Sequence, residues 1–134
     1  MAESTTVRAY AKGVELAPRK VSIVASLVRN RTVADALVIL DHVPRRSALP
    51  IKKAIQSAAA NATETGLDSK TLKITKLSVT TGKRMKRFKP HMRGMALPFQ
   101  KKSSNILVEV SGAEKPKKKP AAKPADKAEK KESK

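Results

Sequence analysis

The sequence has no cysteine and few aromatic residues, with one tyrosine and two phenylalanines among 134 residues. The absence of cysteine excludes disulfides and thiolate metal sites and fits a reducing cytosol. Acidic residues are also scarce, since 30 Lys and Arg stand against 11 Asp and Glu, and the formal net charge is +19. This excess predicts a polyanionic partner, because each neutralised phosphate releases condensed counterions.

Long hydrophobic segments are missing as well. No apolar run approaches the roughly 20 residues that cross a bilayer. The first residues, Met1–Thr6, lack the charged start and apolar centre of a signal peptide. We therefore expect a cytoplasmic protein with no membrane partner.

Residue combinations that support catalysis or metal binding are absent. His42 and His91 are the only histidines, and neither has the carboxylate or cysteine neighbours that complete a ligand set. The acidic residues are scattered singly, which leaves no pair for acid–base chemistry, and no phosphate-binding loop or nucleophile elbow occurs. We expect no enzyme activity, no cofactor, no metal and no small-molecule substrate.

Length and composition divide the chain into two parts. The total length allows one small domain, which we place at residues 1–112. Residues 113–134 are rich in Lys, Ala and Pro and hold nine basic and four acidic residues, with too little apolar surface to offset the entropy of ordering. We expect them to form a disordered basic tail, which leaves a net charge of +14 on residues 1–112.

Periodicity predicts a strand and then a helix in the first 30 residues. Val7–Lys12 alternates apolar and polar residues as a half-buried strand does, and Gly13 ends or bends it. A helix over residues 18–29 begins at Pro18, which suits a first turn because its missing N–H would have no partner there. The predicted apolar stripe of this helix contains Val21, Val24, Ala25 and Val28, widened by Ile23 and Leu27.

Two further helices follow. Thr32 is the expected N-cap of the first, which carries Asp35 in its first turn and ends near Val43 because Pro44 follows. The second begins near Ser47 and ends at Gly66. Predicted buried residues are Val33, Ala36, Leu37 and Leu40 in the first and Ile51, Ala54, Ile55, Ala58, Ala59 and Ala62 in the second.

Two more strands enclose a long interval, between Asp68 and Glu109, that contains no acidic residue. Their alternating residues are Thr75, Leu77 and Val79 in one strand and Ile106, Val108 and Val110 in the other. Leu72 and Ile74 have the opposite phase, which predicts either a bulge near Thr75 or a later start of the strand. We therefore expect an α+β fold in which three helices pack on a small antiparallel sheet.

Residues 82–102, GKRMKRFKPHMRGMALPFQKK, connect these strands and are called the basic ribbon below. We predict a protruding β-hairpin whose tip is at Arg93-Gly94, because glycine accepts the positive φ of a tight turn. Pro90 and Pro98 donate no ladder hydrogen bond, so we expect an irregular ribbon near its end. Eight Lys and Arg lie here together with both phenylalanines, a composition that fits phosphate contacts combined with packing on bases and sugars.

The residues resemble a known family at several points along the chain. Residues 17–21 (APRKV), 56–62 (QSAAANA), 85–87 (MKR), 93–96 (RGMA) and 101–104 (KKSS) are similar to those of the bacterial L-twenty-two family of large-subunit ribosomal proteins. The resemblance covers residues 5–111. It implies a structural constituent of the large subunit that binds several domains of its rRNA and assists early assembly. It also implies neighbouring ribosomal proteins as partners and a hairpin that lines the exit tunnel beside the nascent polypeptide.

Carried over by position, the resemblance implies two groups of functional residues. The exit-tunnel tip would be His91, Met92, Arg93, Gly94 and Met95. This chain departs from the family pattern at His91, Met95 and Pro98, which makes its tip less basic. The implied RNA-binding residues are Arg8, Lys12, Arg19 and Lys20 in the body and Lys83, Arg84, Lys86, Arg87, Lys89, Arg93, Lys101 and Lys102 in the ribbon.

Two other classes of function compete with this interpretation. An architectural DNA-binding protein could use a proline-bearing β-ribbon arm to enter the minor groove, and it would prefer duplex DNA to structured RNA. A membrane-surface protein would place a basic helix face opposite a hydrophobic one. The basic residues of the predicted helices lie mostly near their ends, and the densest positive charge lies on the ribbon, which disfavours the membrane alternative.

Overall fold

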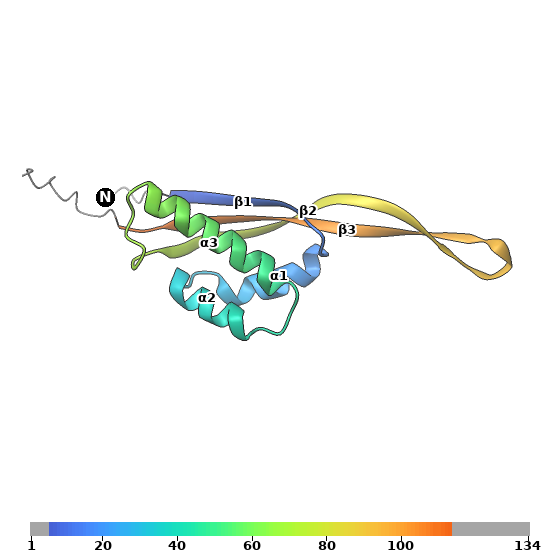
Figure 1. The fold of residues 1–134 in the computed structure, drawn as a ribbon, viewed down its shortest axis with the longest axis horizontal. Helices are drawn as coiled ribbons and strands as arrows, with labels where there is room; N and C mark the ends of the chain where they lie inside the picture. Colours follow the sequence, from blue (N-terminus) through green and yellow to red (C-terminus); the bar gives the residue numbers. More distant parts are fainter. Residues whose placement is uncertain (1–5, 114–134) are drawn as a thin grey trace, which may run out of the picture.

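The computed structural model describes residues 6–113, which form three helices and a three-stranded antiparallel sheet. The sheet order is β1-β3-β2, so the last strand of the chain lies in the middle. All three helices lie on one side of the sheet (Figure 1). This confirms the predicted α+β class. The elements in chain order are β1 (Thr6–Val14), α1 (Pro18–Val28), α2 (Val33–His42), α3 (Ala48–Glu64), β2 (Lys73–Pro90), a single 3₁₀ turn (Met92–Gly94) and β3 (Ala96–Ser111).

The helix ends follow the predicted signals. Pro18 occupies the first turn of α1, and the Thr32 hydroxyl accepts a hydrogen bond from the Asp35 backbone N–H at 3.2 Å to cap α2. At the end of α3, Gly66 has φ of 91°, and the Leu67 N–H donates to the Ala62 carbonyl at 2.9 Å. This is a Schellman ending, which satisfies carbonyls that the last helical turn leaves free.

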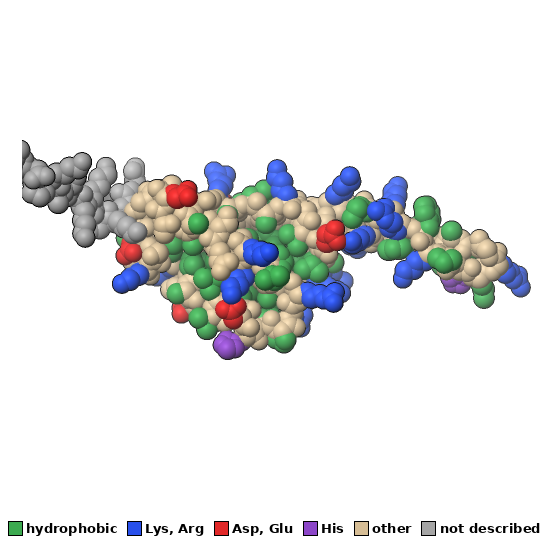
Figure 2. Space-filling view, viewed as in Figure 1, with side chains coloured by type: hydrophobic (Ala, Val, Ile, Leu, Met, Phe, Trp, Pro, Cys, Tyr) green, Lys and Arg blue, Asp and Glu red, His purple; other side chains and the backbone are tan. Residues whose placement is uncertain are grey.

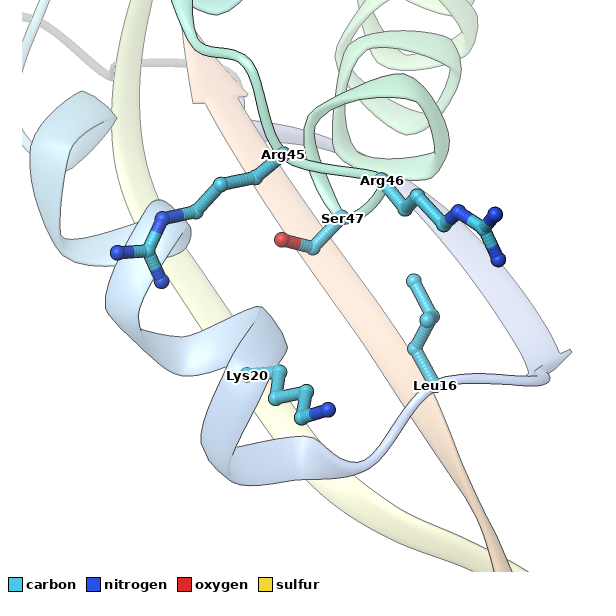
Figure 3. Close-up of a pocket in the computed structure, with 5 residues that line it drawn as sticks. All are labelled: Leu16, Lys20, Arg45, Arg46 and Ser47. Atoms are coloured by element: carbon cyan, nitrogen blue, oxygen red, sulfur yellow. The ribbon is translucent and has the colours of Figure 1, made fainter.

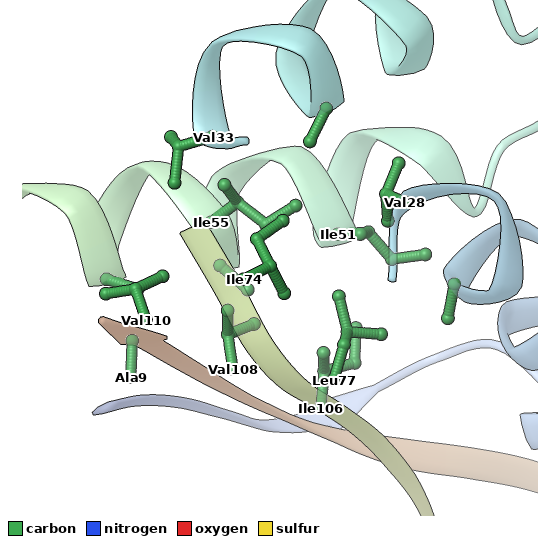
Figure 4. Packing of buried hydrophobic residues seen from close by; sticks show 14 of the residues in the cluster. Ala9, Val28, Val33, Ile51, Ile55, Ile74, Leu77, Ile106, Val108 and Val110 are labelled. Atoms are coloured by element: carbon green, nitrogen blue, oxygen red, sulfur yellow. The ribbon is translucent and has the colours of Figure 1, made fainter. Parts of the chain in front are cut away.

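A single hydrophobic cluster lies between the helices and the sheet (Figure 4). Helix α3 covers β1 and β3, α1 covers β2, and α2 packs on the other two helices. The buried face of α3 is rich in alanine, which lets its backbone approach the sheet closely. The fully buried large side chains include Ile51, Ile55, Leu67, Leu72, Ile74, Ile106, Val108 and Val110.

The predicted bulge in β2 is present. The pairing of β2 with β3 shifts register between Ile74 and Lys76, which leaves Thr75 as the extra residue. Thr75 is therefore exposed and does not share the buried face of Leu77, contrary to the sequence prediction. Ile74 and Leu77 are three positions apart and would lie on opposite faces of a regular strand. The extra residue brings both side chains to the face that the helices cover.

Helix α1 buries a narrower stripe than expected. Val21, Val24, Ala25 and Val28 are buried as predicted, but Ile23 and Leu27 are about half exposed, at 53% and 46%. The prediction that they widen the buried stripe is wrong, because no element of residues 6–113 fully covers this flank of α1. In α2, Leu37 is half-buried beside the core rather than within it.

The basic ribbon projects from the body as the continuation of β2 and β3 (Figure 1). Their antiparallel pairing continues from Arg84↔Lys102 to Pro90↔Ala96. From Arg84 to Pro90 the arm extends roughly 20 Å at about 3.3 Å per residue, and the turn lies beyond it. The turn places Arg93 and Gly94 at positive φ, 56° and 72°, as predicted for the tip.

The ribbon is regular around its prolines, and the expected irregularity there is wrong. No register shift occurs between Arg84 and Pro90. The His91 N–H donates to the Met95 carbonyl at 2.7 Å, and because pair types alternate along an antiparallel ladder, Pro90↔Ala96 and Phe88↔Pro98 are non-hydrogen-bonded pairs. Both proline nitrogens therefore point outward, where no ladder bond is needed.

The register shift lies instead at the ribbon base, between Thr81 and Arg84. A Cβ on Gly82 would lie 2.7 Å from the Ser103 Oγ, so a larger residue here would have to displace the Ser103 hydroxyl. The Ser103 hydroxyl donates to the Lys83 carbonyl at 2.6 Å. This close approach of β2 and β3 lies at the boundary between the part of the sheet that the helices cover and the free ribbon.

Residues 114–134, nearly all of the predicted tail, lie outside the described residues. Within residues 6–113, no helix combines the length and the hydrophobicity that crossing a membrane requires.

Candidate nucleic-acid interface

The exposed cations of the ribbon are interspersed with large apolar side chains. Every residue from Lys86 to Lys102 is exposed. Figure 2 shows Lys and Arg side chains along the ribbon with hydrophobic side chains between them. Exposed fractions are 69% for Phe88 and Met92 and 62% for Met95, values that are unusual for such side chains. Large apolar side chains are exposed in the body too, such as Leu49 at 61%, but on the ribbon they lie among the cations of one continuous arm.

The strand register divides the ribbon side chains between two faces, because residues paired across an antiparallel ladder lie on the same face and successive residues alternate. We call these the Phe88 face and the Phe99 face. The Phe88 face carries Arg84, Lys86, Phe88, Pro90, Ala96, Pro98, Gln100 and Lys102, and the Phe99 face carries Met85, Arg87, Lys89, Leu97, Phe99 and Lys101. Both faces therefore combine positive charge with an aromatic ring.

One cation–π contact lies on the Phe99 face. The Lys89 ammonium lies 5.3 Å from the centre of the Phe99 ring, diagonally across the two strands. At an exposed site such a contact contributes about 0.5–1 kcal/mol. It holds a charge and a ring side by side, in the arrangement that a phosphate next to a base or ribose requires.

An acidic residue reaches the ribbon at its base. The Glu15 carboxylate accepts a hydrogen bond from the Lys101 ammonium at 2.6 Å, although the two residues are 86 positions apart. This hydrogen bond, together with the positive charge of Lys101, lowers the pKa of Glu15 below its usual range. Sequence patterns gave no sign of this pair, because it forms only when the loop after β1 folds against the ribbon.

The body cations expected to contact RNA lie on two separate surfaces. Arg8 and Lys12 are exposed on β1, where the Lys12 ammonium lies 5.3 Å from the centre of the Tyr10 ring. Arg19 and Lys20 lie in the first turn of α1, in the helical layer. The fold thus brings the ribbon cations together but does not join all four body residues to them in one patch.

Two arginines that the sequence analysis did not select lie beside Lys20. Arg45 and Arg46 precede α3 and, with Leu16 and Ser47, line a pocket of about 420 Å³ (Figure 3). The available signal was the pair of arginines directly before a helix whose first turn has no acidic residue. This signal is weak by itself, because only the fold places Lys20 next to the pair.

The tip is a compact turn. The Met95 N–H donates to the Met92 carbonyl at 3.3 Å, and all five residues from His91 to Met95 are exposed. Among residues 6–113, no group of three or more His, Cys, Asp or Glu side chains is placed to hold a metal ion. The tip therefore presents one arginine and two methionines on a short 3₁₀ turn.

A small α+β body that carries a protruding, positively charged β-ribbon is typical of a protein that binds nucleic acid. The family of Ribosomal protein L22p/L17e matches residues 9–111, and the chain belongs to this family. It is a structural protein of the large ribosomal subunit, it takes part in translation within the cytoplasmic ribosome, and it binds rRNA.

Proposed function

We propose that the ribbon is the main rRNA contact of this protein and that it binds with both faces at once. The observation that carries this proposal is the alternation of Lys, Arg and large apolar residues on the Phe88 face and on the Phe99 face. A ribbon that lay on one RNA surface would need only one such face. Cations on both faces fit an arm enclosed between RNA segments, with phosphates contacting Lys and Arg and unpaired bases or riboses packing on the phenyl rings.

The body has a different role in this proposal. Arg8 and Lys12 on β1 and Arg19 and Lys20 on α1 seat it on rRNA at two surfaces, while the paired strands of the ribbon carry its turn roughly 20 Å beyond Arg84. Contacts so far apart support binding to several rRNA domains and a part in early assembly of the subunit. Binding to several rRNA domains, a part in early assembly and contacts with neighbouring ribosomal proteins accord with membership of the family.

The tip is proposed to lie at the wall of the exit tunnel, beside the nascent polypeptide. The support is the position of residues 91–95 at the far end of a regular arm and the membership of the family. With Arg93 as its one Lys or Arg, the tip presents mainly apolar and polar groups to the tunnel. Such a surface suits a wall past which chains of any sequence must move.

Chemical probing of large-subunit rRNA with and without the full-length protein tests this function. Bound wild-type protein should protect RNA positions in at least two domains, and replacing the ribbon should remove one group of protections and leave another. A preference for duplex DNA over large-subunit rRNA in direct competition at equal salt would contradict the proposal. That result would instead favour the architectural DNA-binding alternative, for which exposed Pro90 near the ribbon end is the favourable observation.

A further inference from the structure

We propose that the pocket between the loop after β1 and the start of α3 binds one phosphate group of the rRNA backbone. This inference rests on the proposed function and assigns part of the RNA interface to residues outside the ribbon. The pocket is lined by Leu16, Lys20, Arg45, Arg46 and Ser47. Its three cations come from two elements that the fold brings together, the first turn of α1 and the segment that leads into α3.

The charge around the pocket is not neutralised by the protein. Among residues 6–113 the ion pairs are Lys52–Asp41 and Lys101–Glu15, so Lys20, Arg45 and Arg46 pair with no acid there. Glu15, the carboxylate nearest in sequence to Leu16, is held by Lys101 at 2.6 Å. These three cations line one hollow, so a phosphate that enters it meets only positive side-chain charge.

A buried serine also lines this pocket. Ser47 is only 4% exposed, and its side chain caps no backbone N–H of α3. Figure 3 shows the Ser47 oxygen on the side of Arg45 and Lys20, while the Arg46 side chain extends to the other side of Ser47. A phosphate oxygen in the pocket would accept a hydrogen bond from this hydroxyl.

The backbone around Ser47 adds to the preference for an anion. Ser47 has helical φ and ψ and stands at the N-terminus of α3, a helix of 17 residues. The aligned peptide dipoles place partial positive charge at that end, and anions bind there favourably. Helix dipole, three cations and a hydroxyl donor together match a phosphate group.

Two triple variants of the full-length protein test the site. One carries Lys20→Gln, Arg45→Gln and Arg46→Gln, and the matched control carries Lys70→Gln, Lys73→Gln and Lys76→Gln, three exposed lysines at the other end of the body. In the pocket variant the slope of log affinity for large-subunit rRNA against log salt should fall by about one, as for one phosphate. Its affinity should fall about tenfold or more, because charge-assisted hydrogen bonds are lost. The control should lose less than about threefold because its three lysines line no part of the pocket.

Equal losses in the two triple variants would overturn the proposal, and a slope reduced by about three would replace the single phosphate with three separate ones. Ser47→Ala keeps every charge and should weaken rRNA binding about threefold to tenfold at unchanged melting temperature. Unchanged affinity in this variant would also overturn the site, because its hydroxyl is the buried donor on which the site rests.

Amide NMR shifts of Ser47 and Ala48 identify the source of the phosphate. Inorganic phosphate or a short RNA should shift them in the wild type and not in the pocket variant. A response to RNA alone assigns the site to the phosphodiester, whereas a response to inorganic phosphate alone, or to neither, overturns the proposal. The rRNA-binding measurements also separate the two proposals. Wild-type protein that fails to bind rRNA contradicts the proposed function. Wild-type binding together with unchanged rRNA affinity in the pocket variant contradicts only the phosphate site.

Discussion

The body and the ribbon share two strands but place their apolar side chains in opposite ways. In the body, β2 and β3 bury Leu77, Ile106 and Val108 beneath three helices. Beyond Gly82 the same strands expose Phe88 and Phe99 on a two-stranded arm. The comparison shows that one continuous hairpin serves two purposes: its covered half stabilises the fold, and its free half supplies the surface that binds RNA.

Replacing the free half is expected to have the largest effect on RNA binding. Residues 86–100 can be replaced by Asn-Gly, a turn that would close on the pair Met85↔Lys101 and keep the contact of Lys101 with Glu15. Four cations are lost, so rRNA affinity should fall on the order of several hundred-fold and the salt slope by about three to four. Circular dichroism should still show a cooperative thermal transition. A chain that no longer melts cooperatively would show that the ribbon stabilises the body.

A pair of single substitutions sharpens the comparison. Ile55→Ala removes a fully buried side chain and should lower the free energy of unfolding by about 2–5 kcal/mol. Phe88→Ala removes a larger side chain that is 69% exposed and should change stability by less than about 0.5 kcal/mol. In rRNA binding the order should reverse, with about a tenfold loss for Phe88→Ala through lost stacking. Urea denaturation measures the free energy of unfolding, and filter binding measures the rRNA affinity. Equal destabilisation by both substitutions would contradict the division of roles between body and ribbon.

A third prediction tests whether both ribbon faces touch phosphates. Arg84 lies on the Phe88 face, Arg87 on the Phe99 face and Arg93 at the tip. Changing all three to Gln should lower the salt slope of rRNA binding by about two to three. Each of the three single variants should lower the salt slope by about one third of the decrease in the triple variant. A slope that depends on Arg84 or Arg87 alone would mean that only one face meets RNA.

The smallest expected effect is a pH-dependent change at the ribbon base. The pKa of Glu15 is lowered by Lys101, so the pair stabilises the base at pH values above the ordinary glutamate range. This contribution is lost as the pH falls through the lowered pKa. NMR titration of the Glu15 carboxyl should give a lower midpoint in the wild type than in Lys101→Gln. Identical midpoints would show that the pair does not persist in solution.

Most of the fold could be predicted from the sequence because its signals are local. Caps such as Thr32 and Gly66 and the alternation of Ile106, Val108 and Val110 depend only on neighbouring residues. The stripe on α1 was predicted too wide because periodicity does not reveal which flank another element covers, as Ile23 shows.

The errors at the ribbon and the omissions at the site have one cause. Whether Pro90 and Pro98 disturb a ladder depends on which pairs are hydrogen-bonded, and that is fixed by the register of the turn. Similarly, the nearness of Lys20 to Arg45 and of Glu15 to Lys101 arises only from the tertiary fold. Charge density along the chain located the ribbon, but it could not locate contacts formed between distant segments.

The outward-pointing prolines have a consequence for the protein before it meets RNA. A free two-stranded arm has two open edges, and such edges are templates on which strands of other molecules can pair and aggregate. Pro90 interrupts the donor row on the edge of β2, and Pro98 does the same on the edge of β3. Each edge therefore lacks one N–H that an incoming strand would need. The two prolines thus disfavour the addition of foreign strands to the exposed hairpin before it binds RNA.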